Sequence, residues 1–151
     1  MNADIAFAKG KTHPVCQDYA VAHVTDTCAS VLVSDGCSGS PLTDFGARIL
    51  SQCALNNLSL LRDDSSPTSE ANREAFLTAT AHDASGAARL LKLPPQCLDA
   101  TLMIVRADAE SYHAEVHGDG AIVIFGVSLS RRNIFDLELV GFSDRGSWLT
   151  K

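Results

Sequence analysis

The chain has 151 residues, of which 46% are hydrophobic and 20% are charged. This length fits one domain, and the hydrophobic fraction supports a packed core and excludes a disordered chain. Acidic residues outnumber basic ones by 18 to 12, and the resulting net charge of −6 excludes general binding to a nucleic-acid backbone. We therefore expect no nucleic-acid partner.

The cysteines and the N-terminus bear on the compartment of the protein. No two of the five cysteines form a Cys-x-x-Cys pair, which a thiolate zinc site would need. Charged residues at Asp4, Lys9 and Lys11 interrupt the N-terminus before an apolar stretch can form a signal peptide. The apolar runs are also too short to span a membrane. We expect a cytoplasmic protein with free thiols and no membrane partner.

The first half of the chain predicts three short strands and then a long helix. The strands are expected at residues 5–9, 19–24 and 30–34, and the third leads into Asp35 and Gly36 and a loop of small residues. Apolar side chains recur at steps of three and four over residues 42–61, which indicates a helix. Its apolar stripe is expected to include Leu42, Phe45, Ile49, Cys53 and Leu61, with Gly46, Leu50, Ala54 and Leu58 beside them.

A second helix and four more strands follow. Ser66 is a suitable N-cap and Pro67 a first-turn residue for a helix that reaches Leu91 and is stopped by the prolines at 94 and 95. Strands are expected at residues 100–106, 112–117, 121–127 and 134–140. Strands, two helices and then strands form an α+β arrangement, because the helices do not alternate with the strands.

Three aspartates occupy the ends of predicted strands. Asp18 precedes one strand, Asp35 follows a buried strand, and Asp119 lies between two glycines at a turn. If these strands share a sheet, the carboxylates can converge, and oxygen ligands of this kind suit Mg²⁺ or Mn²⁺. Asp-Gly is also a common turn pair with no further role, so both interpretations stay open at this point.

Four short motifs, in order along the chain, resemble the metal-dependent protein phosphatases of the 2C type. They are the segments at residues 11–19, 33–40, 99–102 and 117–120. The resemblance implies an αββα sandwich, in which two packed antiparallel sheets are flanked by helices. It also implies a phosphoserine or phosphothreonine protein as substrate.

The resemblance further implies a centre of two or more Mn²⁺ or Mg²⁺ ions. In it, Asp35 would bridge the metals, the Gly36 carbonyl would contribute, Asp18 would hold the centre directly or through water, and Asp119 would serve an additional ion. A water between the metals would attack phosphorus in line, without a covalent enzyme intermediate.

The sequence departs from the family pattern at several positions. His13 stands where many members carry a phosphate-binding arginine, so we expect it to contact phosphate without the arginine's bidentate geometry. Ser40 stands where many bacterial members have a histidine. Asp144 lies in a segment that resembles a later metal-binding motif but is interrupted by Arg145.

The C-terminal end of the chain bears on its completeness. We expect residues 1–151 to form a single domain that is incomplete at the C-terminus, because the family continues with two more metal-binding aspartates. The missing strands would leave an exposed β surface, through which the chain would self-associate. The segment 128–151 receives no role.

Two other functions remain open. The chain is also consistent with a catalytically inactive phosphatase-like module that binds a metal or a partner. A serine hydrolase is a further alternative, because Ser38 lies between a strand and a helix and Asp99 with His113 or His117 would complete a triad in the right chain order.

Overall fold

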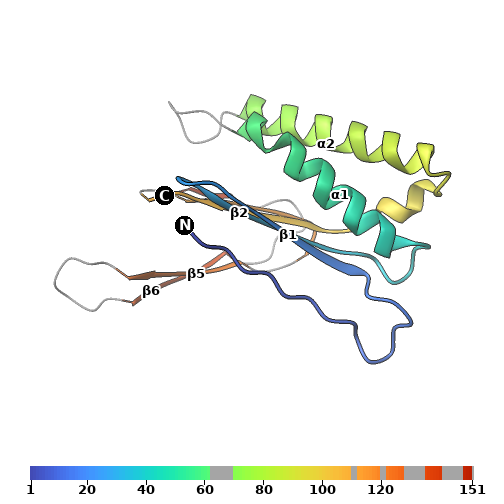
Figure 1. Cartoon of the computed structure of the whole chain (residues 1–151), viewed down its shortest axis with the longest axis horizontal. Helices are drawn as coiled ribbons and strands as arrows, with labels where there is room; N and C mark the ends of the chain where they lie inside the picture. Colours follow the sequence, from blue (N-terminus) through green and yellow to red (C-terminus); the bar gives the residue numbers. More distant parts are fainter. Residues whose placement is uncertain (62–69, 110–111, 120–121, 128–134, 141–147, 151) are drawn as a thin grey trace.

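The computed structural model describes residues 1–61, 70–109, 112–119, 122–127, 135–140 and 148–150. This part of the chain is α+β: two helices lie on one side of an antiparallel sheet, and a two-stranded hairpin lies on the other side (Figure 1). The strands are β1 (Asp18–Val24), β2 (Ala29–Asp35), β3 (Leu102–Ala107), β4 (Tyr112–His117), β5 (Ile122–Val127), β6 (Phe135–Val140) and β7 (Trp148–Thr150). The helices are α1 (Thr43–Asn57) and α2 (Glu70–Leu90), with short 3₁₀ turns η1 (Leu58–Leu61) and η2 (Pro95–Leu98).

The larger sheet has the strand order β1-β2-β3-β4-β7, and every neighbouring pair is antiparallel. β1 and β2 pair along their whole length, from Asp18 opposite Asp35 to Val24 opposite Ala29. β5 and β6 form a separate antiparallel pair. Strand β3 therefore joins β2 although the two helices separate them in the sequence.

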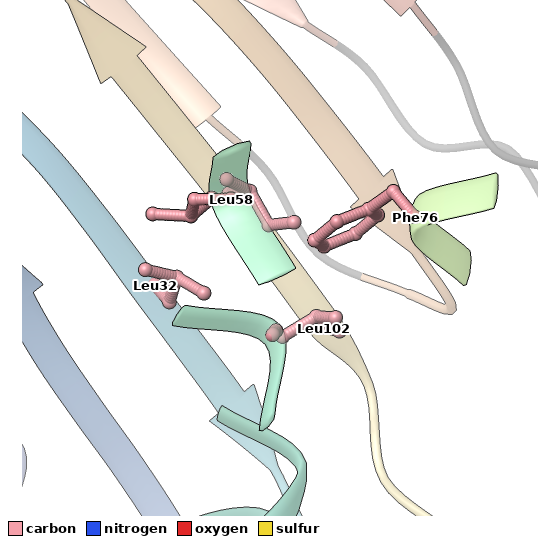
Figure 2. Packing of buried hydrophobic residues seen from close by; sticks show 6 residues of the cluster. Leu32, Leu58, Phe76 and Leu102 are labelled. Carbon is pink, nitrogen blue, oxygen red and sulfur yellow. The ribbon is translucent and has the colours of Figure 1, made fainter. Parts of the chain in front are cut away.

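The main core lies between this sheet and the helices. Leu32 of β2 and Leu102 of β3 point toward Leu58 of η1 and Phe76 of α2 (Figure 2). Phe76 and Leu32 are fully buried. Removing these side chains from water supplies most of the free energy that holds the helices on the sheet.

A second apolar cluster lies on the opposite face of the sheet. Side chains alternate between the two faces along a strand, so Met103 and Val105 point away from the helices. They pack with Ala114, Val116 and Ile122. Ile122 is the first residue of β5, so this cluster anchors the start of the hairpin against the sheet.

The strand expected at residues 5–9 does not form. All five of its side chains are exposed, so the segment adds no apolar surface to either cluster. Phe7 instead lies against the ring of Tyr19, with 5.7 Å between the ring centroids. A short apolar alternation was not enough to specify a strand here, because a strand needs a paired neighbour and a buried face.

Helix α1 forms where expected, but the face that it buries was predicted wrongly in part. Leu42 and Phe45 are 45% and 50% exposed. The buried face carries small residues instead: Thr43, Gly46, Ala47, Ser51 and Ala54. The reason is close packing, since a Cβ added at Gly46 would overlap the backbone carbonyl of Cys97 in η2. A larger side chain therefore has no room at position 46.

The other elements follow the predictions closely, with one omission. Helix α2 ends at Leu90 and β4 spans the residues expected for it, whereas the expected start of α2 at Ser66 lies outside the described residues. The short strand β7 was not predicted. Neither described helix is long and apolar enough to cross a membrane.

Candidate functional site

The ends of four strands meet at one end of the larger sheet. β1 begins and β2 ends there, and β3 begins and β4 ends beside them, because all these pairs are antiparallel. Asp18 and Asp35 are opposite each other in the β1–β2 register. Val21 and Leu32 pack in the helix-side core. Each lies three residues from its aspartate along the strand, so the alternation of side chains turns both carboxylates to the opposite face.

The electrostatic environment of Asp35 shows which groups surround it. Partial burial raises the pKa of its carboxyl, and a hydrogen bond and the charge of the neighbouring Asp18 raise that pKa further. The negative charge of Asp119 acts in the same direction, whereas His13 acts in the opposite one. Two acidic side chains and one imidazole thus act on the Asp35 carboxyl.

These residues line one cleft, with a volume of about 530 Å³. The cleft includes all but one of the residues predicted for the site: His13, Asp18, Asp35, Gly36 and Asp119. The remaining one, Asp144, lies outside the described residues. Residues from an N-terminal loop, the β1–β2 pair and a turn about 100 positions further along the chain therefore reach the same space.

Gly36 is required by close approach of the surrounding backbone. A Cβ at this position would lie 2.8 Å from the Cβ of Thr43 and 2.9 Å from the carbonyl oxygen of Gln17. The Gly36 amide donates a hydrogen bond to that same oxygen, at 3.2 Å. Glycine lets the chain just after β2 pass close to both Gln17 and the start of α1 while keeping Asp35 at the edge of the cleft.

Thr43 supports the loop after Gly36 in a way that the sequence did not reveal. Its hydroxyl is fully buried, accepts a hydrogen bond from the Gln17 side chain at 2.9 Å and donates one to the Cys37 carbonyl at 3.1 Å. The signal was a polar residue on the buried face of a helix, but that face was recognisable only after the helix had been placed.

The carboxylates suit a hard divalent cation, although they do not form a complete cage. Among the residues that the structure describes, no group of three or more His, Cys, Asp or Glu side chains is assembled closely enough to hold a metal ion. The adjacent Asp18 and Asp35 carboxylates nevertheless supply the oxygen donors that Mn²⁺ and Mg²⁺ prefer, and Mg²⁺ commonly completes its coordination with water. The chemistry of the donor pair therefore fits such an ion.

The residues of the alternative serine-hydrolase triad have other partners. His113 and His117 lie 2.9 and 2.7 Å from the two carboxylate oxygens of Glu115, which is fully buried. Asp99 accepts a hydrogen bond from Ser40 at 2.6 Å, not from Ser38. These contacts do not support a triad built on Ser38.

Comparison with known proteins agrees with the metal-dependent phosphatase resemblance. No curated protein matches the chain closely enough to be counted as a relative. A family model, described as protein phosphatase 2C, matches residues 10–138 and thus covers all the described residues of the cleft except Ala8. On this match over most of its length, the chain belongs to the protein phosphatase 2C family.

Proposed function

We propose that this phosphatase-like domain is a metal-dependent phosphatase that removes phosphate from phosphoserine and phosphothreonine in proteins. The observation that carries the proposal is the Asp18–Asp35 pair, with two carboxylates side by side at the edge of an open cleft. Two negative charges held this close repel each other unless a proton or a cation lies between them. A cation-binding role explains why the fold keeps both.

Asp18 and Asp35 would hold the ion, and the Gly36 carbonyl and Asp119 are the further ligands that we assign to this site. A bound Mn²⁺ or Mg²⁺ would supply Lewis-acid activation of a water and offset the negative charge of the phosphoryl group. The hydrogen bonds of Thr43 and the close packing around Gly36 support the backbone next to Asp35, which would help to orient its carboxylate toward the ion.

His13 is the residue that we assign to the phosphate group of the substrate. This assignment is supported by its place in the lining of the cleft and by its effect on Asp35, whose pKa it lowers. An imidazolium donates hydrogen bonds to phosphate oxygens but does not form the paired contacts of a guanidinium. We therefore expect weaker substrate binding than in relatives that carry arginine there.

A second candidate is an inactive phosphatase-like module that binds a metal or a partner. It is favoured by the incomplete donor set, since the described residues hold no assembled group of three ligands. Such a module would bind Mn²⁺ through Asp18 and Asp35 without turning over substrate. Binding and turnover must therefore be measured separately.

We also infer that the β5–β6 hairpin is the beginning of the second sheet of an αββα sandwich. This inference is supported by the apolar cluster in which Ile122 packs on the sheet face opposite the helices. The free thiols of all five cysteines are consistent with the cytoplasm, where we place the protein.

Self-association is a further proposal. Strand β1 lies at one edge of the described sheet, and its last residue, Val24, is 42% exposed. Unpaired strand edges are templates for pairing with another chain. Sedimentation should show a dimer that the substitution Val24→Lys disperses, and a wild-type protein that sediments as a monomer would contradict this.

The metal-dependent function is tested by binding linkage. Mn²⁺ should raise the melting temperature of the wild type, because it binds the folded chain only. Asp18→Asn and Asp35→Asn should lose most of this increase. Asp26→Asn is the matched control, since Asp26 is exposed and lies outside the cleft. Equal Mn²⁺ responses in all four proteins would remove the aspartate pair from the site.

Turnover is tested with an aryl phosphate and a phosphoserine peptide. Hydrolysis should require Mn²⁺ or Mg²⁺, stop with a chelator and survive a serine-directed fluorophosphonate, because the nucleophile is a water. Mn²⁺ stabilisation without hydrolysis would favour the inactive module. Labelling of Ser38 with loss of activity would favour the hydrolase.

A further inference from the structure

Thr101, just before β3, contacts the elements that carry two of the three cleft aspartates. It lines the cleft between the end of β2 and the turn after β4. Its hydroxyl oxygen accepts a hydrogen bond from the Asp35 backbone amide, and its methyl group lies against Gly118, the residue before Asp119. The two halves of one small side chain therefore contact two different parts of the site.

The hydroxyl side of Thr101 fixes the backbone of Asp35. The Asp35 amide donates to the Thr101 Oγ1 at 3.1 Å, and the Thr101 amide donates to the Asp35 carbonyl at 2.8 Å. The preceding Ser34 side chain donates to the Thr101 carbonyl at 2.6 Å. Three hydrogen bonds thus hold the end of β2, and one of them depends on the Thr101 side chain.

The methyl side of Thr101 fixes the turn that leads to Asp119. Gly118 has a φ of +101°, which L-residues rarely adopt. A Cβ on Gly118 would lie 2.8 Å from the Thr101 Cγ2, so the turn passes directly over this methyl group. The Thr101 methyl group therefore packs against the residue that precedes Asp119.

We propose that Thr101 is a positioning residue that sets the separation of Asp35 and Asp119, with its hydroxyl acting on Asp35 and its methyl group acting on the Asp119 turn. The consequence for metal binding rests on the function proposed above, whereas the positioning itself is a property of the metal-free chain. A residue that only started β3 would affect both aspartates together. Two substitutions, one that removes the hydroxyl and one that removes the methyl group, should affect Asp35 and Asp119 separately.

The first experiment uses the metal-free protein and compares Thr101→Val with Thr101→Ser. Valine keeps the bulk and loses the hydroxyl, so the Asp35 amide should exchange its hydrogen faster and shift its NMR resonance, while the Asp119 amide stays unchanged. Serine keeps the hydroxyl and loses the methyl group, so the Asp119 resonance should shift and the Asp35 amide should stay protected.

The second experiment titrates the same variants with Mn²⁺. Loss of a group that orients a metal ligand typically weakens affinity by about 10-fold or more, and Thr101→Val should weaken Mn²⁺ binding by about 10-fold. Thr101→Ser should weaken Mn²⁺ binding only while Asp119 is present. The double variant with Thr101→Ser and Asp119→Asn should therefore bind Mn²⁺ as tightly as the single variant Asp119→Asn. The double variant with Thr101→Val and Asp119→Asn should bind Mn²⁺ more weakly than either single variant.

Thr80→Val is the control for loss of a threonine hydroxyl. Thr80 is buried in α2, and its hydroxyl has no hydrogen-bond partner among the described residues. This variant should leave both amides and the Mn²⁺ affinity unchanged. The proposal fails if Thr101→Val and Thr101→Ser disturb both aspartate amides alike, or if neither disturbs them. Absence of Mn²⁺ binding in the wild type would overturn the proposed function, while the amide measurements would still decide the role of Thr101.

Discussion

Asp18 and Asp35 face each other across the β1–β2 ladder, and the nearby Asp18 carboxyl helps to raise the pKa of Asp35. The pair is near the surface, and its members approach the same point from two strands that pair directly. The arrangement is unfavourable for the metal-free protein, because Asp119 adds a third negative charge nearby. If the site binds a cation as proposed, the cation would offset this repulsion.

The first prediction concerns the repulsion between these carboxylates. Asp35→Asn should stabilise the metal-free protein at neutral pH and low salt, because it removes one of two repelling charges and its amide can donate to Asp18. The gain should be about 0.5 kcal/mol after solvent screening, or about 1–2 °C in melting temperature. Thermal melts with chelator measure it, and added salt should reduce the difference. A lower melting temperature than the wild type would contradict the repulsion.

The second prediction compares two helical glycines. Gly46→Ala should destabilise the fold by about 2 kcal/mol or more, because the new methyl group would overlap the Cys97 carbonyl. Gly86→Ala should stabilise it by about 0.5–1 kcal/mol, since nothing lies within 4 Å of that position and alanine favours a helix. Denaturant unfolding of both variants measures the contrast. Equal effects would show that α1 does not pack against η2 as described.

The third prediction concerns pH. Burial alone raises the pKa of Glu115, but the hydrogen bonds from His113 and His117 outweigh it and hold that pKa below its usual value of 4.5. An acid with a lowered pKa stabilises the fold above its unfolded pKa and loses that contribution as the pH falls. The free energy of unfolding should therefore drop as the pH falls below about 4.5.

The matching variant is Glu115→Gln. It should cost about 2 kcal/mol at neutral pH, because two imidazoles lose a buried charged partner. Its stability should fall less steeply below pH 4.5 than that of the wild type. Unfolding by urea over a pH series measures both effects. Parallel pH profiles for the two proteins would remove Glu115 as their source.

The fourth prediction concerns two phenylalanines. Phe76→Ala should destabilise the protein by about 3–5 kcal/mol, because Phe76 is fully buried between α2 and the sheet. Phe45→Ala should change stability by no more than about 0.5 kcal/mol, because that side chain is half exposed. Urea unfolding measures both. A large loss for Phe45→Ala would indicate that another chain covers this part of α1.

Several elements were predictable because local pattern and tertiary structure agree in them. Strand β4 has an apolar alternation between two turn signals, and its bounds were predicted correctly. The α1 stripe was partly wrong, because the buried face is decided by the close approach of Cys97 to Gly46 and not by hydrophobicity. Strand β7, at Trp148–Thr150, is too short to produce a periodic signal.

The aspartates that line the cleft were predictable as residues, but their geometry was not. Asp18, Asp35 and Asp119 could be selected because each lies at a strand end beside a turn. The roles of Thr43 and Thr101 could not, because they depend on which backbone groups the register places opposite their hydroxyls. Whether the aspartates bind a metal stays a prediction.

The β1–β2 hairpin has a consequence for the order of folding. Its two strands are joined by a short turn, in which Thr25 and Cys28 exchange backbone and side-chain hydrogen bonds. We expect contacts this local to form early, before β3 arrives from beyond both helices. The mutual repulsion of Asp18 and Asp35 would then be present in the first element to assemble. A divalent cation that relieves it would accelerate folding, and would act as a nucleating agent for the chain as well as a ligand of the finished site.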